Sequence, residues 1–463
     1  MHAQEGPLEV RRWLDNQRFS LFQWRVLLLC FAIVAVDGFD TACVGFIAPA
    51  LAGQWHLQPA VLGTLFGSGL IGLMVGALLF GPLADRIGRR KTLIATVAFF
   101  GLASLLAASA PNIAALIAFR FVTGLGLGGA MPNAIALTSE YCPERKKSFL
   151  TTVMFCGFTL GSGLGGVAAA QLLPVYGWRS VFVLGGVLPL ALVPVMLVVL
   201  PESVRYLMLR KDVAQERIAR ILGKIAPHAL AADTRFVLNE TAHSGSPVRQ
   251  LFTREYRSGT LLLWVVFFMS LLVVYLLTNW LPTLIHQSGL PLAVASKVAV
   301  MYQVGGTIGA LVIGQLMDKR SPTAILTWSY GFGAVFLVAT GIATGTPLVL
   351  AVMGVGFCIS GSQIGANAYV ARYYPTSSRV TGISWALGIG RLGSVIGALV
   401  GGALLSANIS FPALFAIVAA PAAIASLAIF ACGRHVSSAA TARAVASSDC
   451  GGGSTRFRVS TSA

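Results

Sequence analysis

Long apolar stretches constrain this chain more than any other feature. About twelve segments carry roughly 20 or more mostly apolar residues, enough to cross a hydrocarbon core about 30 Å thick. Hydrophobic residues make up 56% of the sequence and charged residues 11%, so a soluble fold could not bury them all. A spanning segment must satisfy its own backbone hydrogen bonds, so we expect every span to be a helix. The expected spans are 22–51, 61–84, 92–110, 113–139, 148–173, 180–200, 260–285, 293–317, 323–343, 347–371, 381–405 and 413–430.

Lys and Arg residues gather on one side of these spans. All but four lie in the N-terminus, the tail, the long central loop, or the turns after spans two, four, eight and ten; the exceptions are Arg120, Arg179, Lys297 and Arg391. Because basic residues mark cytoplasmic segments, we expect both termini in the cytoplasm. The net charge of +17 then reflects topology and attraction to anionic lipid, and needs no nucleic-acid partner. The polar start of the chain argues against a cleavable signal peptide.

The sequence offers no combination of side chains that indicates an enzyme. The seven cysteines fall in the spans or on the basic side, which implies no disulfide framework. Cys and His residues are not clustered at metal-ligand spacing, and the six histidines fall in loops, tails or span ends. A nucleotide-binding loop and a nucleophile with a neighbouring base are also missing. We therefore expect no cofactor, no metal and no enzymatic activity.

The two halves of the sequence repeat each other in the same order. The loop 81–91 after span two resembles 314–320 after span eight, and Tyr141 after span four matches Tyr373 after span ten. Glycines of span five also recur in span eleven, at nearly the sequence separation that relates the other matched segments. Such parallel repeats predict an all-α membrane protein of twelve helices in two six-helix halves. The expected parts are a cytoplasmic N-terminus 1–21, bundles 22–200 and 259–432, a cytoplasmic linker 201–258, and a disordered tail 433–463.

Two acids, Asp37 and Asp40, lie halfway along the first span. They are three residues apart and so share one helix face, at a depth where each carboxylate costs several kcal/mol. Low dielectric and mutual repulsion favour protonation of at least one, so the pair could carry a proton. Arg120 in span four lies at a compatible depth and is the expected partner. The alternatives are that one Asp caps a helix break at Gly38, and that Arg120 is a static clamp.

Arg391 is the only basic residue within the membrane part of the second half. A guanidinium binds a carboxylate through two parallel hydrogen bonds and cannot be discharged, which suits an anionic substrate. The alternative is bonding to backbone carbonyls in a glycine-rich helix. Aromatic and amide side chains at similar depth could stack on a ring and bond a phenol, although each could equally serve packing: Tyr275, Asn279, Trp280, Tyr302, Gln303, Gln363 and Asn367.

Several motifs carry a resemblance to known transporters. The loop 81–91, the glycine-rich run 120–129 and Pro201-Glu202-Ser203 resemble signatures of the major facilitator superfamily. Within it, the stretches 37–40, 45–51, 131–133, 279–283 and 384–391 resemble the aromatic acid:proton symporters, and the likeness spans about 25–430. It implies a bacterial inner-membrane importer of aromatic carboxylates such as 4-hydroxybenzoate or protocatechuate. The expected partners are that carboxylate, protons and membrane lipid, with the protein as a monomer.

The resemblance also implies a gate at the cytoplasmic ends of the helices. Charges of the loop 81–91 in such proteins latch the two halves in the outward-facing state, which points to Asp85 and Arg86 near Glu140 and Arg145. Asp318 is the second-half equivalent, in a degraded copy of the motif. For Arg89, Arg90 and Lys91 we expect only a topological role.

Other functions remain open from the sequence. The substrate could be another acid, such as gallate, a hydroxyphenylpropionate or muconate. Span five lacks the proline that proton antiporters of the superfamily usually carry beside its glycines, which favours symport over drug export. A membrane sensor would use the loop 201–258 and the tail as partner surfaces. The preferred mechanism is alternating access, in which protonation of the acid pair frees the site and the substrate carboxylate docks on Arg391.

Overall fold

Twelve helices are long and apolar enough to cross a membrane in a computed structural model that describes residues 8–209, 215–226, 236–237, 247–253, 255–374, 378–407 and 409–451. The all-α class and the twelve predicted spans are confirmed. In chain order the elements are β1 (Leu8–Glu9), α1 (Val10–Asn16), α2 (Leu21–Trp55), α3 (Pro59–Ile87), α4 (Arg89–Ala108), α5 (Ile113–Tyr141), α6 (Glu144–Tyr176), α7 (Arg179–Val199), α8 (Val204–Leu209), α9 (Gln215–Gly223), β2 (Phe236–Val237), α10 (Pro247–Leu251), α11 (Arg257–Gln287), α12 (Leu292–Lys319), α13 (Pro322–Ile342), α14 (Gly345–Val355), the π-helix η1 (Gly356–Ser360), α15 (Gly361–Tyr373), α16 (Arg379–Ser406) and α17 (Phe411–Gly451).

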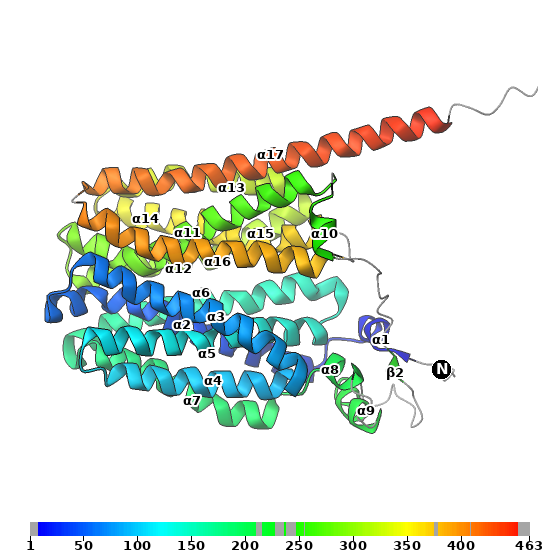
Figure 1. The fold of residues 1–463 in the computed structure, drawn as a ribbon, viewed down its shortest axis with the longest axis horizontal. Coiled ribbons are helices and arrows are strands. Elements are labelled where there is room, and N and C mark those ends of the chain that lie inside the picture. The colour runs from blue at the N-terminus through cyan, green and yellow to red at the C-terminus, as the bar shows by residue number, and fades with distance from the viewer. Residues whose placement is uncertain are drawn as a thin grey trace, which may run out of the picture.

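The spanning helices form two groups that lie side by side (Figure 1). Helices α2–α7 make the N-terminal half, and α11–α17, with α14, η1 and α15 as one span, make the C-terminal half. We call the end where α2 begins the basic end, because it also holds the α3–α4 and α5–α6 turns with their Arg residues. The other end, with the α2–α3 turn, is the far end.

The predicted linker and the start of the chain associate at the basic end. Strands β1 and β2 pair in parallel, with Leu8 opposite Phe236. Trp13 of α1 and Ile218 of α9 belong to the same buried apolar cluster as the basic-end parts of α2 and α5. At the other terminus, α17 continues as one helix to Gly451, whereas the sequence led us to expect disorder from Gly433; residues 452–463 lie outside the described residues.

Side-chain caps explain where two of the spanning helices begin. Ser20 and Gln23 form a capping box at the start of α2, each side chain bonding the other's backbone amide. The Gln23 side-chain Nε2 also donates to the Tyr141 carbonyl at 2.7 Å, which ties the start of α2 to the end of α5. Asn112 caps α5 by accepting from the Ala115 amide at 2.9 Å. These caps set the register of the two helices that carry the predicted acid pair and its partner.

Glycines allow the close helix contacts within each half. A Cβ at Gly161 of α6 would collide with the backbone of Ala35 on α2, and one at Gly397 of α16 would collide with Leu272 on α11. The repeat predicted from the sequence therefore recurs as equivalent helix pairs. The contact between halves uses other glycines, such as Gly166, where a Cβ would lie 2.5 Å from Val300 of α12.

The two halves touch closely in the part of the bundle toward the far end. A Cβ at Gly45 of α2 would lie 2.6 Å from the Asn279 carbonyl of α11, and one at Gly402 of α16 would lie 2.7 Å from the Pro59 carbonyl of α3. Phe66 meets Trp280 edge to face, with ring centroids 4.9 Å apart. These backbone contacts close the far end of the interface.

Valine at Gly45 is therefore expected to open the far end. Its side chain cannot fit against the Asn279 backbone, and overpacking of this kind costs about 1–3 kcal/mol. Since about 1.4 kcal/mol is tenfold in a population, a cysteine introduced at Leu70 should react about tenfold faster with an impermeant maleimide added at the far end. Gly53→Val is the matched control, because nothing lies within 4 Å of a Cβ there. Equal labelling in both variants would contradict the assignment of this contact.

Candidate functional site

Asp40 and Arg120 form a buried ion pair in the N-terminal half. Arg120 Nη1 of α5 lies 2.7 Å from Asp40 Oδ2 of α2, and both side chains are at most 5% exposed. Ser104 of α4 donates to Asp40 Oδ1 at 3.1 Å. The guanidinium also lies over the Phe182 ring of α7, 5.7 Å from its centroid. Both carboxylate oxygens of Asp40 are thus satisfied, and the pair joins four helices.

Asp37 lies one turn away and is not paired in this way. Thr41 donates to its Oδ1 at 3.3 Å, while Oδ2 is buried and has no hydrogen-bond partner among the described residues. The Arg391 charge attracts this carboxylate and the Asp40 charge repels it. The two acids expected to act as a pair therefore have different partners. The proposed helix break at Gly38 is absent, since α2 runs unbroken through that position and Gly38 packs on the backbone of Phe158.

Arg391 of α16 lies where the two halves meet. Its Nη1 donates to the Tyr275 hydroxyl of α11 at 2.7 Å, and its Nη2 lies 3.9 Å from the Met131 sulfur of α5. The partners of the guanidinium are thus side chains, not the backbone carbonyls of the alternative interpretation. A Cβ at Gly388, one turn toward the basic end, would meet nothing within 4 Å. The half-buried guanidinium is therefore held from two sides and still offers N–H groups for an anion.

A small cavity lies between α2, α3, α5 and α11, beside the Asp40–Arg120 pair. Its polar lining comes from three side chains, Thr41, Arg120 and Asn279. Asn279 Nδ2 donates to the Tyr275 carbonyl at 2.8 Å. The remaining lining is apolar and comes from Val44, Leu65, Phe66, Gly69, Leu70, Leu73 and Leu127. Tyr275 and Asn279 thus connect the cavity to Arg391 along one face of α11.

The other predicted contacts are placed differently. Trp280 is fully buried and its Nε1 donates to the Ala398 carbonyl at 2.8 Å, so it packs α11 on α16. Tyr302 and Gln303 of α12 and Gln363 and Asn367 of α15 make no hydrogen bond to Arg391 or Asp37 within the described part of the chain. Gln363 Oε1 and Asn367 Oδ1 are buried and have no hydrogen-bond partner among the residues that the structure describes. They follow η1, a π-helical turn of the kind frequent at functional sites, for which the sequence carried no signal.

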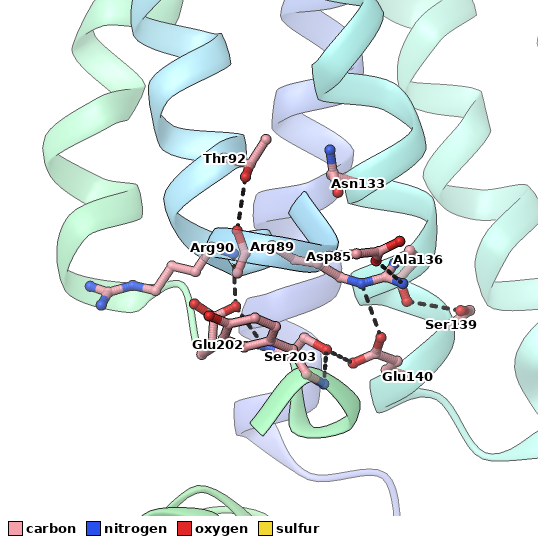
Figure 2. A network of polar contacts seen from close by, with 12 residues as sticks. Asp85, Arg89, Arg90, Thr92, Asn133, Ala136, Ser139, Glu140, Glu202 and Ser203 are labelled. Atoms are coloured by element: carbon pink, nitrogen blue, oxygen red, sulfur yellow. Dashed lines mark hydrogen bonds and ion pairs between the residues drawn. The ribbon is translucent and has the colours of Figure 1, made fainter. Parts of the chain in front are cut away.

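A second polar network lies at the basic end (Figure 2). Arg89 Nε of α4 lies 3.4 Å from Glu140 Oε1 of α5, and Arg89 Nη2 lies 3.8 Å from Asp85 Oδ1. Ser203 donates to Glu140 Oε2 at 2.6 Å, and Glu202 accepts from the Arg90 amide at 3.0 Å. The network therefore joins α3, α4 and α5 to the Pro-Glu-Ser segment.

Two residues expected at the gate, Arg86 and Arg145, make other contacts at the basic end. The Arg86 side chain is exposed, and its backbone carbonyl accepts from the Tyr206 hydroxyl at 3.3 Å. Arg145 donates to the Asp15 carbonyl at the end of α1 at 3.0 Å. Arg89 makes the ion pairs instead, although the sequence suggested only a topological role for it. The reason is Gly88, whose φ of +104° redirects the chain so that α4 starts at Arg89, above Glu140.

The second-half counterpart is simpler. Asp318 accepts from Arg372 at 2.6 Å, and both side chains are well exposed, at 66% and 49%. Exposed pairs of this kind contribute about 0–1 kcal/mol. Among the described residues of the C-terminal half we find no network like that around Glu140. The loop 314–320 is a degraded copy of the loop 81–91, which agrees with the weaker set of contacts in the C-terminal half.

Several site residues were missed by sequence reasoning. Ser104 bonds Asp40, and Met131 contacts Arg391 from the opposite half. Glu202 and Ser203 complete the network around Glu140. Ser104 is a polar residue inside an apolar span, and the other three stand in motifs that had been singled out without a role. These signals mark positions, but not the direction in which each side chain points.

Glutamine at Arg120 is expected to destabilise the protein strongly. The change leaves the Asp40 carboxylate buried without its ion-pair partner, which costs about 3–5 kcal/mol. The measurement is thermal unfolding of the purified protein in detergent. Adding Asp40→Asn removes the stranded charge, so the double variant should recover most of the lost stability. Equal destabilisation of the single and double variants would contradict the assignment of a coupled pair.

Comparisons with known proteins agree with this architecture. The family model of the Major Facilitator Superfamily matches residues 30–363 and 298–452. A gallate transporter of Pseudomonas putida is 46% identical over 432 residues, 93% of this chain and 96% of its own. The 4-hydroxybenzoate transporter PcaK of Pseudomonas aeruginosa is 46% identical over 426 residues, 91% of this chain and 95% of its own.

A solved structure shows the same fold at low sequence identity. The partially occluded inward-open structure of the xylose transporter XylE from E. coli has a TM-score of 0.71 and 17% identity, and the match covers 89% of this chain and 98% of that one. The family match covers more than half of the chain, and the curated relatives extend over nearly all of it. The chain therefore belongs to the Major Facilitator Superfamily.

Proposed function

We propose that this protein is a proton-coupled symporter that imports aromatic carboxylates, with 4-hydroxybenzoate or protocatechuate as the first candidates. The observation that carries the proposal is the buried, unpartnered oxygen of Asp37 in the field of Arg391, where the two halves meet. Asp37 could bind a proton there, and Arg391 could bind the carboxylate of a substrate. The names of the relatives, a 4-hydroxybenzoate transporter and a gallate transporter, support the substrate class.

The proposal places the protein in the bacterial inner membrane. The basic end faces the cytoplasm, since loops rich in Lys and Arg stay there, and so do both termini. Exposed apolar side chains such as Val198 and Trp328 then contact lipid. The two bundles, 22–200 and 259–432, move as bodies joined by the linker 201–258, and the protein works as a monomer.

Transport follows from the different surroundings of the two acids. A proton on Asp37 removes the negative charge that competes for Arg391, and the substrate carboxylate then docks on the guanidinium. With both charges neutralised, the halves can rock about the site. Asp40 and Arg120 stay paired and hold α2 to α5 during this motion. Loss of substrate and proton to the cytoplasm, where protons are scarcer, resets the cycle.

The network around Glu140 is proposed to shape the cytoplasmic gate. Its ion pairs and hydrogen bonds join three spanning helices to the start of the linker, so this end of the N-terminal half moves as one body. Asp85, which is exposed beside the network, is available to the other half when the cytoplasmic end closes. Asp318 and Arg372 provide a weaker latch on the second half.

The test is uptake of radiolabelled 4-hydroxybenzoate into proteoliposomes with and without an inward proton gradient. Uphill uptake that a protonophore abolishes is the expected result. Unlabelled gallate, the substrate named for one relative at 46% identity, is added as competitor to decide between the two substrates. Uptake that only equilibrates under a gradient would contradict proton coupling, and gradient-driven loss of substrate from loaded vesicles would indicate export.

A further inference from the structure

We propose that Asn279 is the residue that reads the ring hydroxyl opposite the substrate carboxylate, an inference that rests on the proposed function. The residue would make this transporter select hydroxylated benzoates over benzoate itself. Its role would be to accept a hydrogen bond from a phenol group, not to stack on the ring.

The spacing along α11 matches the length of such a substrate. Arg391 and the Tyr275 hydroxyl bind each other at 2.7 Å and mark the carboxylate end of the site. Asn279 lies four residues further along α11, a rise of about 6 Å. The Tyr275 side chain tilts toward the start of α11, away from Asn279, so its hydroxyl and Arg391 lie farther from Asn279 than this rise, as a para-substituted ring with a hydrogen bond at each end requires. A carboxylate on Arg391 therefore brings a para hydroxyl to the level of Asn279.

The hydrogen bonding of Asn279 leaves an acceptor free. Its Nδ2 donates to the Tyr275 carbonyl at 2.8 Å, which fixes the amide so that Oδ1 points away from that carbonyl. The described residues show no other hydrogen bond of the Asn279 side chain, so Oδ1 can accept one. A phenol needs an acceptor for its proton, and an amide oxygen with both lone pairs unused provides one.

Among the polar side chains that line the cavity, Asn279 is better suited to accept the phenol proton than the other two. Arg120 has no acceptor atom and is engaged by Asp40. Thr41 donates to Asp37 and keeps acceptor lone pairs, but it lies on α2 and not on the face of α11 that runs from Tyr275. The apolar side chains of Phe66, Leu70 and their neighbours suit the face of a ring. Asn279 is therefore the best-placed acceptor at the distal end of a bound ring.

The backbone around Asn279 links this contact to closure of the far end. Gly45 of α2 packs against the backbone of Thr278 and Asn279, so the amide sits where the two halves touch. A hydroxyl held by Asn279 thus contacts the C-terminal half beside the helix of Asp37. Selection of the hydroxyl and closure over the substrate occur at the same place.

The test compares 4-hydroxybenzoate and benzoate uptake in proteoliposomes of the full-length wild type, Asn279→Leu and Thr283→Val. Leucine has a similar size and no acceptor, so KM for 4-hydroxybenzoate should rise about tenfold, as expected for loss of one hydrogen bond. KM for benzoate should stay within about twofold, because benzoate has no hydroxyl to lose. Thr283→Val is the matched control, one turn along α11 and outside the cavity lining.

The outcomes separate the inference from the function on which it rests. Wild-type protein that carries neither compound would overturn the proposed function and the inference with it. A wild type that carries both, with an unchanged preference in Asn279→Leu, would overturn the inference alone. Loss of both activities in Asn279→Leu but not in Thr283→Val would also overturn it, since Asn279 would then be needed for structure and not for selection.

Discussion

Asparagine at Asp37 should abolish uphill accumulation of the aromatic carboxylate. The variant keeps the size of the side chain and can still accept from Thr41, but it cannot bind or release a proton. Because the variant binds no proton at this position, the proton gradient cannot drive substrate movement. The internal concentration of the substrate should therefore only reach the external one. Because Asn resembles the protonated acid, Arg391 stays free for the carboxylate and exchange across the membrane should persist. Uptake and counterflow in the same proteoliposomes measure the two activities.

The pH dependence gives a second readout for the same variant. Wild-type uptake should fall as the external pH rises and Asp37 loses its proton, whereas exchange by Asp37→Asn should not change with pH over that range. Thr41→Val is the matched control, because it removes the hydrogen bond to Oδ1 and keeps the carboxyl group. It should retain uphill uptake. Accumulation against a gradient by Asp37→Asn would show that another group carries the proton.

Much of this site could be predicted from the sequence because depth in a membrane follows from position along a helix. At 1.5 Å per residue, Asp40 and Arg120 were expected at compatible levels, and the structure brings them together at 2.7 Å. The twelve helices and the two halves followed from hydropathy and from repeated motifs in the same way. Position along the helix axis and the cost of buried charge sufficed for these features.

Direction around the helix axis could not be predicted as well. Asp37 and Asp40 share a face of α2, yet one bonds Ser104 and Arg120 while the other lies in the field of Arg391, because α2 contacts both halves. The pairing of Glu140 with Arg89 and not with Arg86 depends on the positive φ of Gly88, and neither composition nor periodicity reports a backbone angle. Contacts between distant helices decide such details.

Lysine at Arg391 is expected to lower kcat/KM for the aromatic carboxylate by about 10- to 100-fold. Arg391 holds the Tyr275 hydroxyl with Nη1 and still offers N–H groups to an anion, because its planar fork has five donors. Lysine keeps the charge but is a point donor that cannot keep this geometry. Losing one hydrogen bond to a charged group costs about 1.5–3 kcal/mol, which corresponds to about 10- to 100-fold. Initial rates of uptake at several substrate concentrations measure the loss.

Arg372→Lys is the control that separates substrate binding from general electrostatics. Arg372 also pairs with an acid, Asp318, but that pair is exposed at the basic end, so the change should leave kcat/KM within about twofold. Substrate-induced thermal stabilisation should disappear in Arg391→Lys and persist in Arg372→Lys, because only a ligand that binds the folded state raises its stability. Full stabilisation of Arg391→Lys by substrate would place the carboxylate elsewhere. Arg120 would then be the next candidate, since it lines the neighbouring cavity, and Asp40 would have to release it for each substrate carried.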